Sequence, residues 1–137
     1  GRKIADGHEI AILSIGHPGN FVADACKQLF TDGIDPAHYD MRFAKPLDEE
    51  LLHEISQKFD KIITVEDGCI QGGFGSAVLE FMNAQGYKPD IKMLGIPDKI
   101  TEHGKPAELQ KECGFDAAGI AMAVRNMLQE KLIVKES

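Results

Sequence analysis

Hydrophobic and polar positions divide the chain into two kinds of stretch that follow each other in turn. Residues 8–15 form a nearly continuous apolar run, which is typical of a strand buried on both faces of a sheet. Residues 39–43, 61–66 and 91–94 predict three further strands. Longer stretches between them repeat apolar residues at helical spacing. Strands that alternate with amphipathic helices predict an α/β fold, in which helices cover both faces of a parallel sheet.

The helices are bounded by recognisable capping residues. Asn20 is expected to cap the first helix and Gly33 to close it, Asp48 to cap the second, and Asp116 to cap the last. The apolar stripe of the first helix consists of Phe21, Val22, Ala25, Cys26, Leu29 and Phe30. A third helix is expected over 76–84, and a short one at 106–112 within a loop that spans 99–114.

These elements predict a single domain over 8–131. Residues 1–7 are expected to form a linker or a short edge strand, and residues 132–137 a frayed tail. In an open α/β sheet, ligands and partners gather beyond the carboxyl ends of the strands. We call that edge the carboxyl rim, and the loops expected there are 16–19, 44–47, 66–75 and 95–98.

The stretch 60–81 joins a strand to a helix through a glycine-rich loop with Gly72, Gly73 and Gly75, and Ser76 is expected to open the helix. A helix start of this kind can bind an anion through its backbone N–H groups. The dinucleotide fingerprint is disfavoured because Val78 stands where its third glycine would be, and no Gly-Lys-Ser/Thr is present to make a P-loop. We favour a loop whose glycines permit close approach to another domain, with anion binding as the alternative.

Charged residues of the carboxyl rim complete the candidate site. Glu66 and Asp67 are adjacent, so they face opposite ways in an extended segment and do not make an acid–base pair; one of them can accept hydrogen bonds from backbone donors. Arg42 and Lys45 are candidates for contact with a phosphate or an acidic loop, although an ordinary salt bridge is favoured. His103 is a further rim candidate, and the five histidines match no metal-ligand spacing.

Composition narrows the class of protein. With 137 residues, the chain has the length of one domain, and its net charge of −7 argues against nucleic acid or an anionic membrane as a partner. It contains no apolar run long enough to span a bilayer and no signal peptide is recognised. Three scattered cysteines favour a reduced, cytoplasmic protein. The start at Gly1 hints at a piece of something longer.

Four motifs in register resemble the 1-deoxy-D-xylulose-5-phosphate synthase family. They are MRFAKPLD at 41–48, TVEDG at 64–68 with GGFGSAV at 72–78, LGIPD at 94–98 with His103-Gly104, and GFD at 114–116 with Gly119-Ile120. The resemblance covers residues 8 to about 130. Transketolases and the β-subunits of 2-oxoacid dehydrogenases share the fold and a looser version of these motifs, but not the whole set.

The resemblance implies the C-terminal domain of a transketolase-like enzyme. Its expected fold is a three-layer sandwich around a mostly parallel five-stranded sheet with one antiparallel edge strand. The family joins pyruvate to glyceraldehyde 3-phosphate, using thiamine diphosphate and Mg²⁺ that its first two domains bind. Its product feeds isoprenoid, thiamine and pyridoxal synthesis.

The resemblance assigns no catalytic, cofactor-binding or metal residue to this chain, so no turnover is expected from it alone. The expected partners are the N-terminal and middle domains of the same enzyme and a second copy in a homodimer. Two alternatives remain open. One is a free-standing anion- or small-molecule-binding α/β module that uses the helix start at 72–76. The other is the equivalent domain of a transketolase or a 2-oxoacid dehydrogenase β-subunit.

Overall fold

A computed structural model describes residues 2–16, 19–41, 47–66, 73–95 and 116–136, with side chains as far as residue 129. These residues build a five-stranded sheet in the order β1-β3-β2-β4-β5. Neighbouring strands run parallel except at one edge, where β1 (Arg2–Ala5) pairs antiparallel with β3 (Ala37–Asp40). The expected mostly parallel sheet with one antiparallel edge strand is confirmed, and 1–7 supplies that strand.

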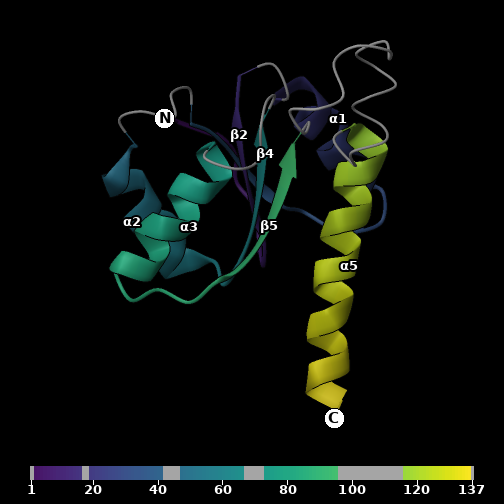
Figure 1. Ribbon diagram of the computed structural model, residues 1–137. Helices are drawn as coiled ribbons and strands as arrows, with labels where there is room; N and C mark the ends of the chain where they lie inside the picture. Colours follow the sequence, from purple (N-terminus) through teal and green to yellow (C-terminus); the bar gives the residue numbers. More distant parts are fainter. Residues whose placement is uncertain (1, 17–18, 42–46, 67–72, 96–115, 137) are drawn as a thin grey trace, which may run out of the picture.

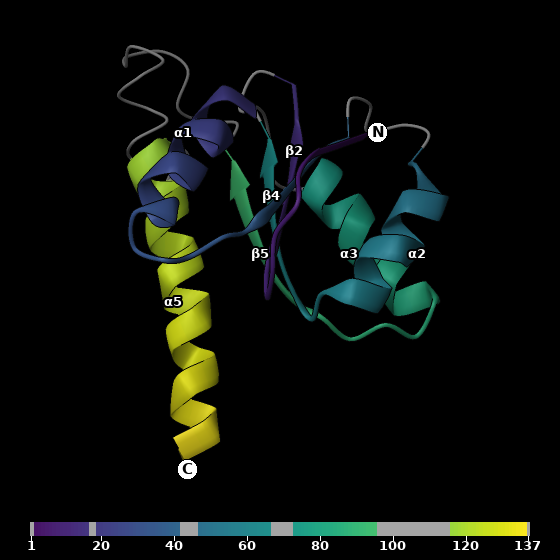
Figure 2. The same cartoon turned by 180° about the vertical axis from the view of Figure 1, so that it is seen from behind.

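The other described elements follow in the expected alternation. The strands are β2 (Ala11–Ile15), β4 (Lys61–Glu66) and β5 (Asp90–Gly95). The helices are α1 (Gly19–Phe30), α2 (Glu49–Lys58), α3 (Phe74–Ala84) and α5 (Ala117–Glu136). Helices α1 and α5 cover one face of the sheet, and α2 and α3 cover the other (Figures 1 and 2). The molecule is therefore the three-layer sandwich that the resemblance implied.

Each face of the sheet has its own hydrophobic core. Alternate residues of a strand point to opposite faces, so neighbours in the central strands divide between the two cores. Ile12 and Ile63 face α1 and α5, whereas Leu13 and Ile62 face α2 and α3. Every residue of β4 is buried, which explains the continuous apolar run that predicted it.

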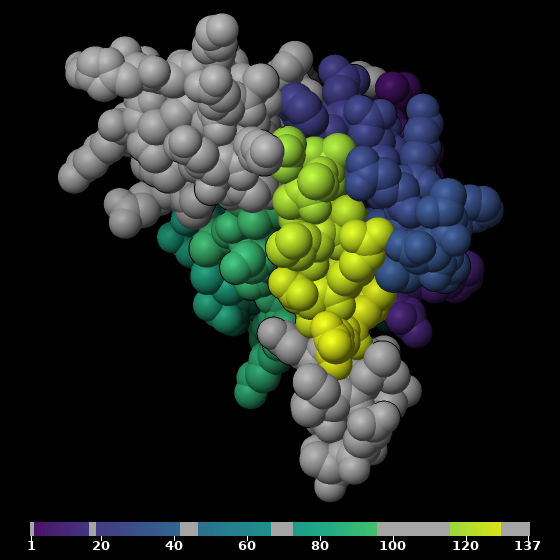
Figure 3. Space-filling model, turned by 90° about the vertical axis from the view of Figure 1, so that its right-hand side faces the viewer, coloured from purple at the N-terminus to yellow at the C-terminus, as the bar shows by residue number. Residues whose placement is uncertain are grey.

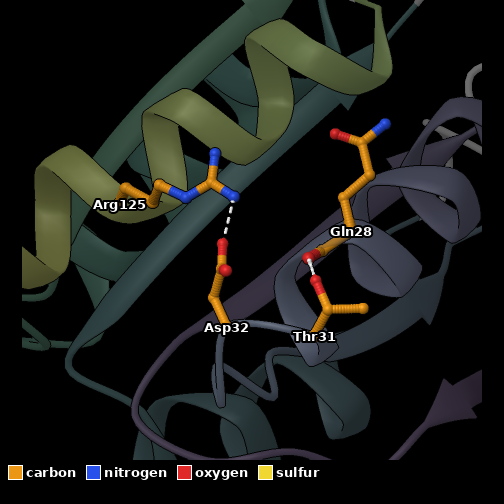
Figure 4. Close-up of polar contacts among 4 residues, drawn as sticks. All are labelled: Gln28, Thr31, Asp32 and Arg125. Atoms are coloured by element: carbon orange, nitrogen blue, oxygen red, sulfur yellow. Dashed lines mark hydrogen bonds and ion pairs between the residues drawn. The ribbon is translucent and has the colours of Figure 1, made fainter.

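Helix α5 lies along the sheet between α1 and β5 (Figure 3). Its apolar positions, including Ile120 and Val124, join the same core as Val22 and Leu29 of α1. On the outer side, the Arg125 guanidinium is 2.5 Å from the Asp32 carboxylate just beyond α1 (Figure 4). Both side chains are half exposed, so this ion pair adds little stability, and the shared core holds α5 in place.

Capping residues bound two helices as the sequence predicted. The Asp48 carboxylate accepts a hydrogen bond from Leu51 N at 3.1 Å at the start of α2. The Asp116 carboxylate accepts one from Gly119 N at 2.9 Å at the start of α5. A side-chain acceptor at this position satisfies one of the backbone donors that a helix start leaves open.

Several element boundaries differ from those expected. Helix α1 begins at Gly19, so Asn20 lies inside the helix and does not cap it. Strand β3 spans Ala37–Asp40, so it begins two residues before the strand that was expected at 39–43. Helix α3 begins at Phe74, before Ser76. Helix α5 extends as far as Glu136, and the fraying of 132–137 stays a prediction. The short helix expected at 106–112 lies outside the described residues.

Within the described residues, no helix combines the length and the apolar character that a bilayer crossing requires.

Candidate functional site

The strongest sequence-predicted feature, the junction from β4 to α3, is built around one buried carboxylate. Glu66 is the last residue of β4, and its side chain is 6% exposed. Its Oε1 accepts a hydrogen bond from Phe74 N at 3.0 Å, and its Oε2 accepts one from Gly75 N at 2.6 Å. Gly73 stands at the N-cap position and offers no side-chain cap. Glu66 therefore takes the place of a capping side chain at this helix.

This arrangement weighs against anion binding at the start of α3. The first backbone donors of a helix favour negative charge, whether it comes from a ligand or from the protein itself. Here the protein supplies it, because both oxygens of Glu66 are engaged by the first two residues of α3. An external anion at Phe74 N and Gly75 N would have to displace a buried carboxylate, which weighs against the alternative of anion binding at these two residues. The expectation that one of the two acids accepts backbone hydrogen bonds is confirmed for Glu66.

Gly75 brings α3 into close contact with the sheet. A Cβ atom at this position would lie 2.7 Å from the Thr64 Oγ1 atom and 2.9 Å from the Met93 side chain. These distances are shorter than real Cβ contacts, so a larger residue would require a shift of α3 or of the Thr64 and Met93 side chains. Gly75 therefore permits close backbone approach within this domain, and the approach of the glycine-rich loop to another domain stays a prediction.

The remaining predicted site residues divide into two groups. Ser76 lies in the first turn of α3, is half-buried and does not open the helix. Glu66, Gly73, Gly75 and Ser76 thus lie together at the junction from β4 to α3. The other members of the predicted set lie outside the described residues: Arg42, Lys45, Asp67, Gly72 and His103.

A second group of polar residues, which sequence reasoning missed, lies at the carboxyl ends of β2 and β3. Ser14 and His38 occupy neighbouring strands, and their register places Ile12 beside His38 and Ser14 beside Asp40. The Ser14 hydroxyl and the His38 Nε2 atom are 2.8 Å apart and share a buried hydrogen bond. Burial lowers the pKa of His38 to about 4, although the Asp40 carboxylate acts in the opposite direction. The imidazole is therefore neutral near pH 7.

These side chains border a cavity of about 280 Å³ beside the first turn of α1. Ser14, His38 and Asp40 line it from the strands, and Asn20 and Ala23 line it from α1. The signal in the sequence was a serine within an apolar strand and a histidine in the next strand. Neither pattern is informative until the register of the two strands is known.

Comparison with known proteins identifies the family. The model of the transketolase C-terminal domain matches residues 1–120. The chain belongs to the transketolase C-terminal domain family. Curated relatives include the 1-deoxy-D-xylulose-5-phosphate synthases of Cytophaga hutchinsonii, 61% identical over 127 residues, and of Aquifex aeolicus, 39% identical over 127 residues. Each alignment covers 93% of this chain but 20% of the relative, so the chain spans about a fifth of their length.

Solved structures agree with the family. A split-gene transketolase, described as an inactive beta4 tetramer, superposes with a TM-score of 0.83 at 29% identity, over 93% of this chain and 41% of that one. A transketolase from Pichia stipitis superposes with a TM-score of 0.63 at 20% identity, over 90% of this chain and 17% of that one, and that likeness concerns the fold alone. The expected transketolase-like fold is confirmed.

Proposed function

We propose that this chain is the C-terminal domain of a 1-deoxy-D-xylulose-5-phosphate synthase. The observation that carries the proposal is the 61% identity to the Cytophaga hutchinsonii enzyme over 93% of the chain. Four sequence motifs in register support the same assignment, because related transketolases share only part of the set. The whole enzyme condenses pyruvate with glyceraldehyde 3-phosphate to 1-deoxy-D-xylulose 5-phosphate, releasing carbon dioxide, in the cytoplasm.

In this proposal the domain contributes packing and dimerisation, and the cofactor belongs to the rest of the enzyme. Thiamine diphosphate would supply carbanion stabilisation, with its diphosphate held through Mg²⁺ by the N-terminal domain. The helix start of α3 does not fit that diphosphate, because the buried Glu66 carboxylate already accepts from Phe74 N and Gly75 N. Bringing a diphosphate there would place two anions against each other. No step of the reaction is therefore assigned to residues of this junction.

The partners of the domain would be the N-terminal and middle domains of the same enzyme and a second copy of the enzyme. The split-gene transketolase supports this division of roles between the packing domain and the rest of the enzyme. The chain that superposes on ours is described as an inactive beta4 tetramer. Arg42, Lys45, Asp67, Gly72 and His103 remain proposed contacts with those partners at the carboxyl rim.

Isothermal titration calorimetry tests the assignment of the cofactor. Thiamine diphosphate with Mg²⁺, titrated into this chain, is expected to give no saturable binding. A full-length synthase titrated in the same buffer is the control and is expected to bind. Tight stoichiometric binding to the isolated chain would contradict the proposal, and would favour the free-standing ligand-binding module.

A further inference from the structure

Strand β1 lies at the edge of the sheet and belongs to neither hydrophobic core. Its residues Arg2, Lys3 and Ile4 are exposed, and Ala5 is half-buried. Within the described part of the chain, neither core includes a residue of β1. Burial of apolar surface is the main force that holds an element in a folded domain. Strand β1 is therefore held to the molecule mainly by its pairing with β3.

The pairing of β1 with β3 is short and irregular. The register shifts by one residue between Lys3 and Ala5, which leaves Ile4 in a bulge that interrupts the ladder of hydrogen bonds. On its outer side, β1 has no neighbouring strand in the described sheet. The ion pair of Lys3 is made with Asp6, three residues along the same segment, so it does not connect β1 to β3. Few backbone hydrogen bonds thus keep the strand in place.

The segment that follows β1 is fixed to the domain. Gly7 lies so close to the backbone of residues 35–37 that a Cβ atom on it would be 2.2 Å from Ala37 N. The next residue, His8, donates a backbone hydrogen bond to Asp35 O at 2.7 Å. A movement of β1 away from β3 would therefore pivot at Gly7, while β2 and β3 keep their places.

Strand β1 closes one side of the cavity at the carboxyl ends of β2 and β3. Its bulge places Ile4 in the lining of this cavity together with Ser14 and His38, and Ala5 lies beside His38 in the sheet. Ser14 is 1% exposed and His38 is 3% exposed, although both are polar. Helix α1 lines another side through Ala23, and this helix is anchored in a core. Of these two covers, β1 is the less firmly held.

We propose that β1 is a strap over the hydrogen-bonded pair of Ser14 and His38. The strap separates from β3 as a unit, pivots at Gly7 and opens the cavity while both cores stay folded. Elements with few buried apolar contacts and solvent-exposed backbone hydrogen bonds open at lower free energy than core strands do. Strand β1 has both properties, whereas every residue of β4 is buried. The strap thereby controls the access of solvent and small molecules to a buried serine and histidine.

Native-state hydrogen exchange tests whether the strap opens independently of the cores. The hydrogen-bonded amides of β1 and β4 would be followed by NMR in this chain at increasing, sub-denaturing concentrations of urea. We expect protection factors in β1 at least about a hundredfold below those in β4, with little dependence on urea, because opening of the strap exposes little surface.

Two results of this measurement would overturn the inference. Equal protection and equal urea dependence in β1 and β4 would show that β1 opens only when the whole domain unfolds. Complete absence of protection in β1 would show that the strap is never closed.

His38 reports whether the opening uncovers the cavity. Diethyl pyrocarbonate modifies accessible neutral imidazoles, and peptide mass spectrometry at low conversion resolves each histidine. A chain lacking residues 1–5 should stay folded by circular dichroism, and His38 should react at least about tenfold faster in it than in the whole chain. His8, whose side chain is 86% exposed, is the internal standard for the reagent. An unfolded deletion variant would overturn the inference, and so would an unchanged rate at His38.

A point substitution tests the role of Ile4 as the closing side chain. Ile4→Ser removes apolar surface that is partly buried in the closed state, so it should raise the rate of modification at His38 by about fivefold. Leu79→Ser, at a similarly exposed position of α3 on the other face of the sheet, is the matched control and should leave that rate unchanged. Equal rates in the two variants would contradict closure by Ile4. None of these outcomes bears on the proposed synthase, whose calorimetric test measures binding of the cofactor.

Discussion

The Glu66 Oε2 atom accepts a hydrogen bond from Gly75 N at 2.6 Å, across the junction between β4 and α3. The same two residues explain why the helix sits where it does. The carboxylate holds the helix start against the end of the strand, and the missing side chain at Gly75 lets the helix lie close to Thr64 and Met93. The junction is therefore a fixed structural unit within this domain.

Glu66→Gln should destabilise the fold. An amide keeps the shape of the side chain but presents an NH₂ group to one of the two backbone donors, so one buried N–H loses its acceptor. We expect the free energy of unfolding to fall by about 1–3 kcal/mol, measured by urea denaturation. Glu80→Gln, at an exposed position of the same helix, is the matched control and should change it by less than about 0.5 kcal/mol. Equal stability of the two variants would show that the carboxylate does not hold the helix.

Gly75→Ala tests the close contact of α3 with the sheet. Alanine favours a helix over glycine by about 1 kcal/mol, but its Cβ would meet the Thr64 Oγ1 atom at 2.7 Å. Thr64 is fully buried in β4, so any shift of its side chain disturbs the surrounding packing, and we expect a net loss of about 1–2 kcal/mol in the free energy of unfolding.

The control for this substitution is Gly19→Ala, at the first residue of α1. A Cβ there would lie 3.5 Å from the Ser14 Oγ atom, which is an ordinary contact, so stability should be unchanged or slightly raised. Thr64→Ala combined with Gly75→Ala should lose less stability than the sum of the two single changes. A stabilising effect of Gly75→Ala alone would contradict the close packing.

The lowered pKa of His38 determines how the free energy of unfolding depends on pH. Its folded-state pKa of about 4 lies below the ordinary value of 6.5, so between these values the unfolded chain binds more protons than the folded one. Stability from this group is therefore complete above about pH 6.5 and is lost as the pH falls toward about 4, by up to about 3 kcal/mol in all.

Urea denaturation at pH 7 and at pH 5 measures this loss, with His38→Gln as the variant that removes the titrating group. The difference between the two pH values should be smaller in His38→Gln, because the other titrating groups remain in both proteins. An NMR titration of the His38 ring protons gives the folded-state pKa directly. A midpoint near 6.5 would show that the imidazole is not held neutral by burial.

Periodicity predicted the alternation of strands and helices because the central strands are buried on both faces and the helices on one. The continuous apolar run at 61–66 corresponds to a strand with every residue buried, and the aspartates at 48 and 116 cap helices as their sequence context indicated. The antiparallel edge strand and the five-stranded sheet came from the family resemblance, since a short polar segment at 1–7 has no periodicity of its own.

The candidate site was predicted only in part, because its contacts depend on how strands and helices meet. Glu66 was recognised as a possible acceptor, but the sequence could not show that its carboxylate reaches the start of the helix eight residues later. The pair Ser14 and His38 is separated by 24 positions and meets only through the register of β2 and β3. Asn20 failed as a cap because the helix already begins at Gly19.

The most direct test of the synthase assignment is a chimera. The matching fifth of the Cytophaga hutchinsonii enzyme would be replaced by this chain, and the condensation of pyruvate with glyceraldehyde 3-phosphate would be measured, with the enzyme lacking that part as the control. We predict that kcat/KM lies within about tenfold of the unaltered enzyme, a difference of about 1.4 kcal/mol, and that the truncated control is inactive. A folded chimera as inactive as the truncated control would contradict the assignment.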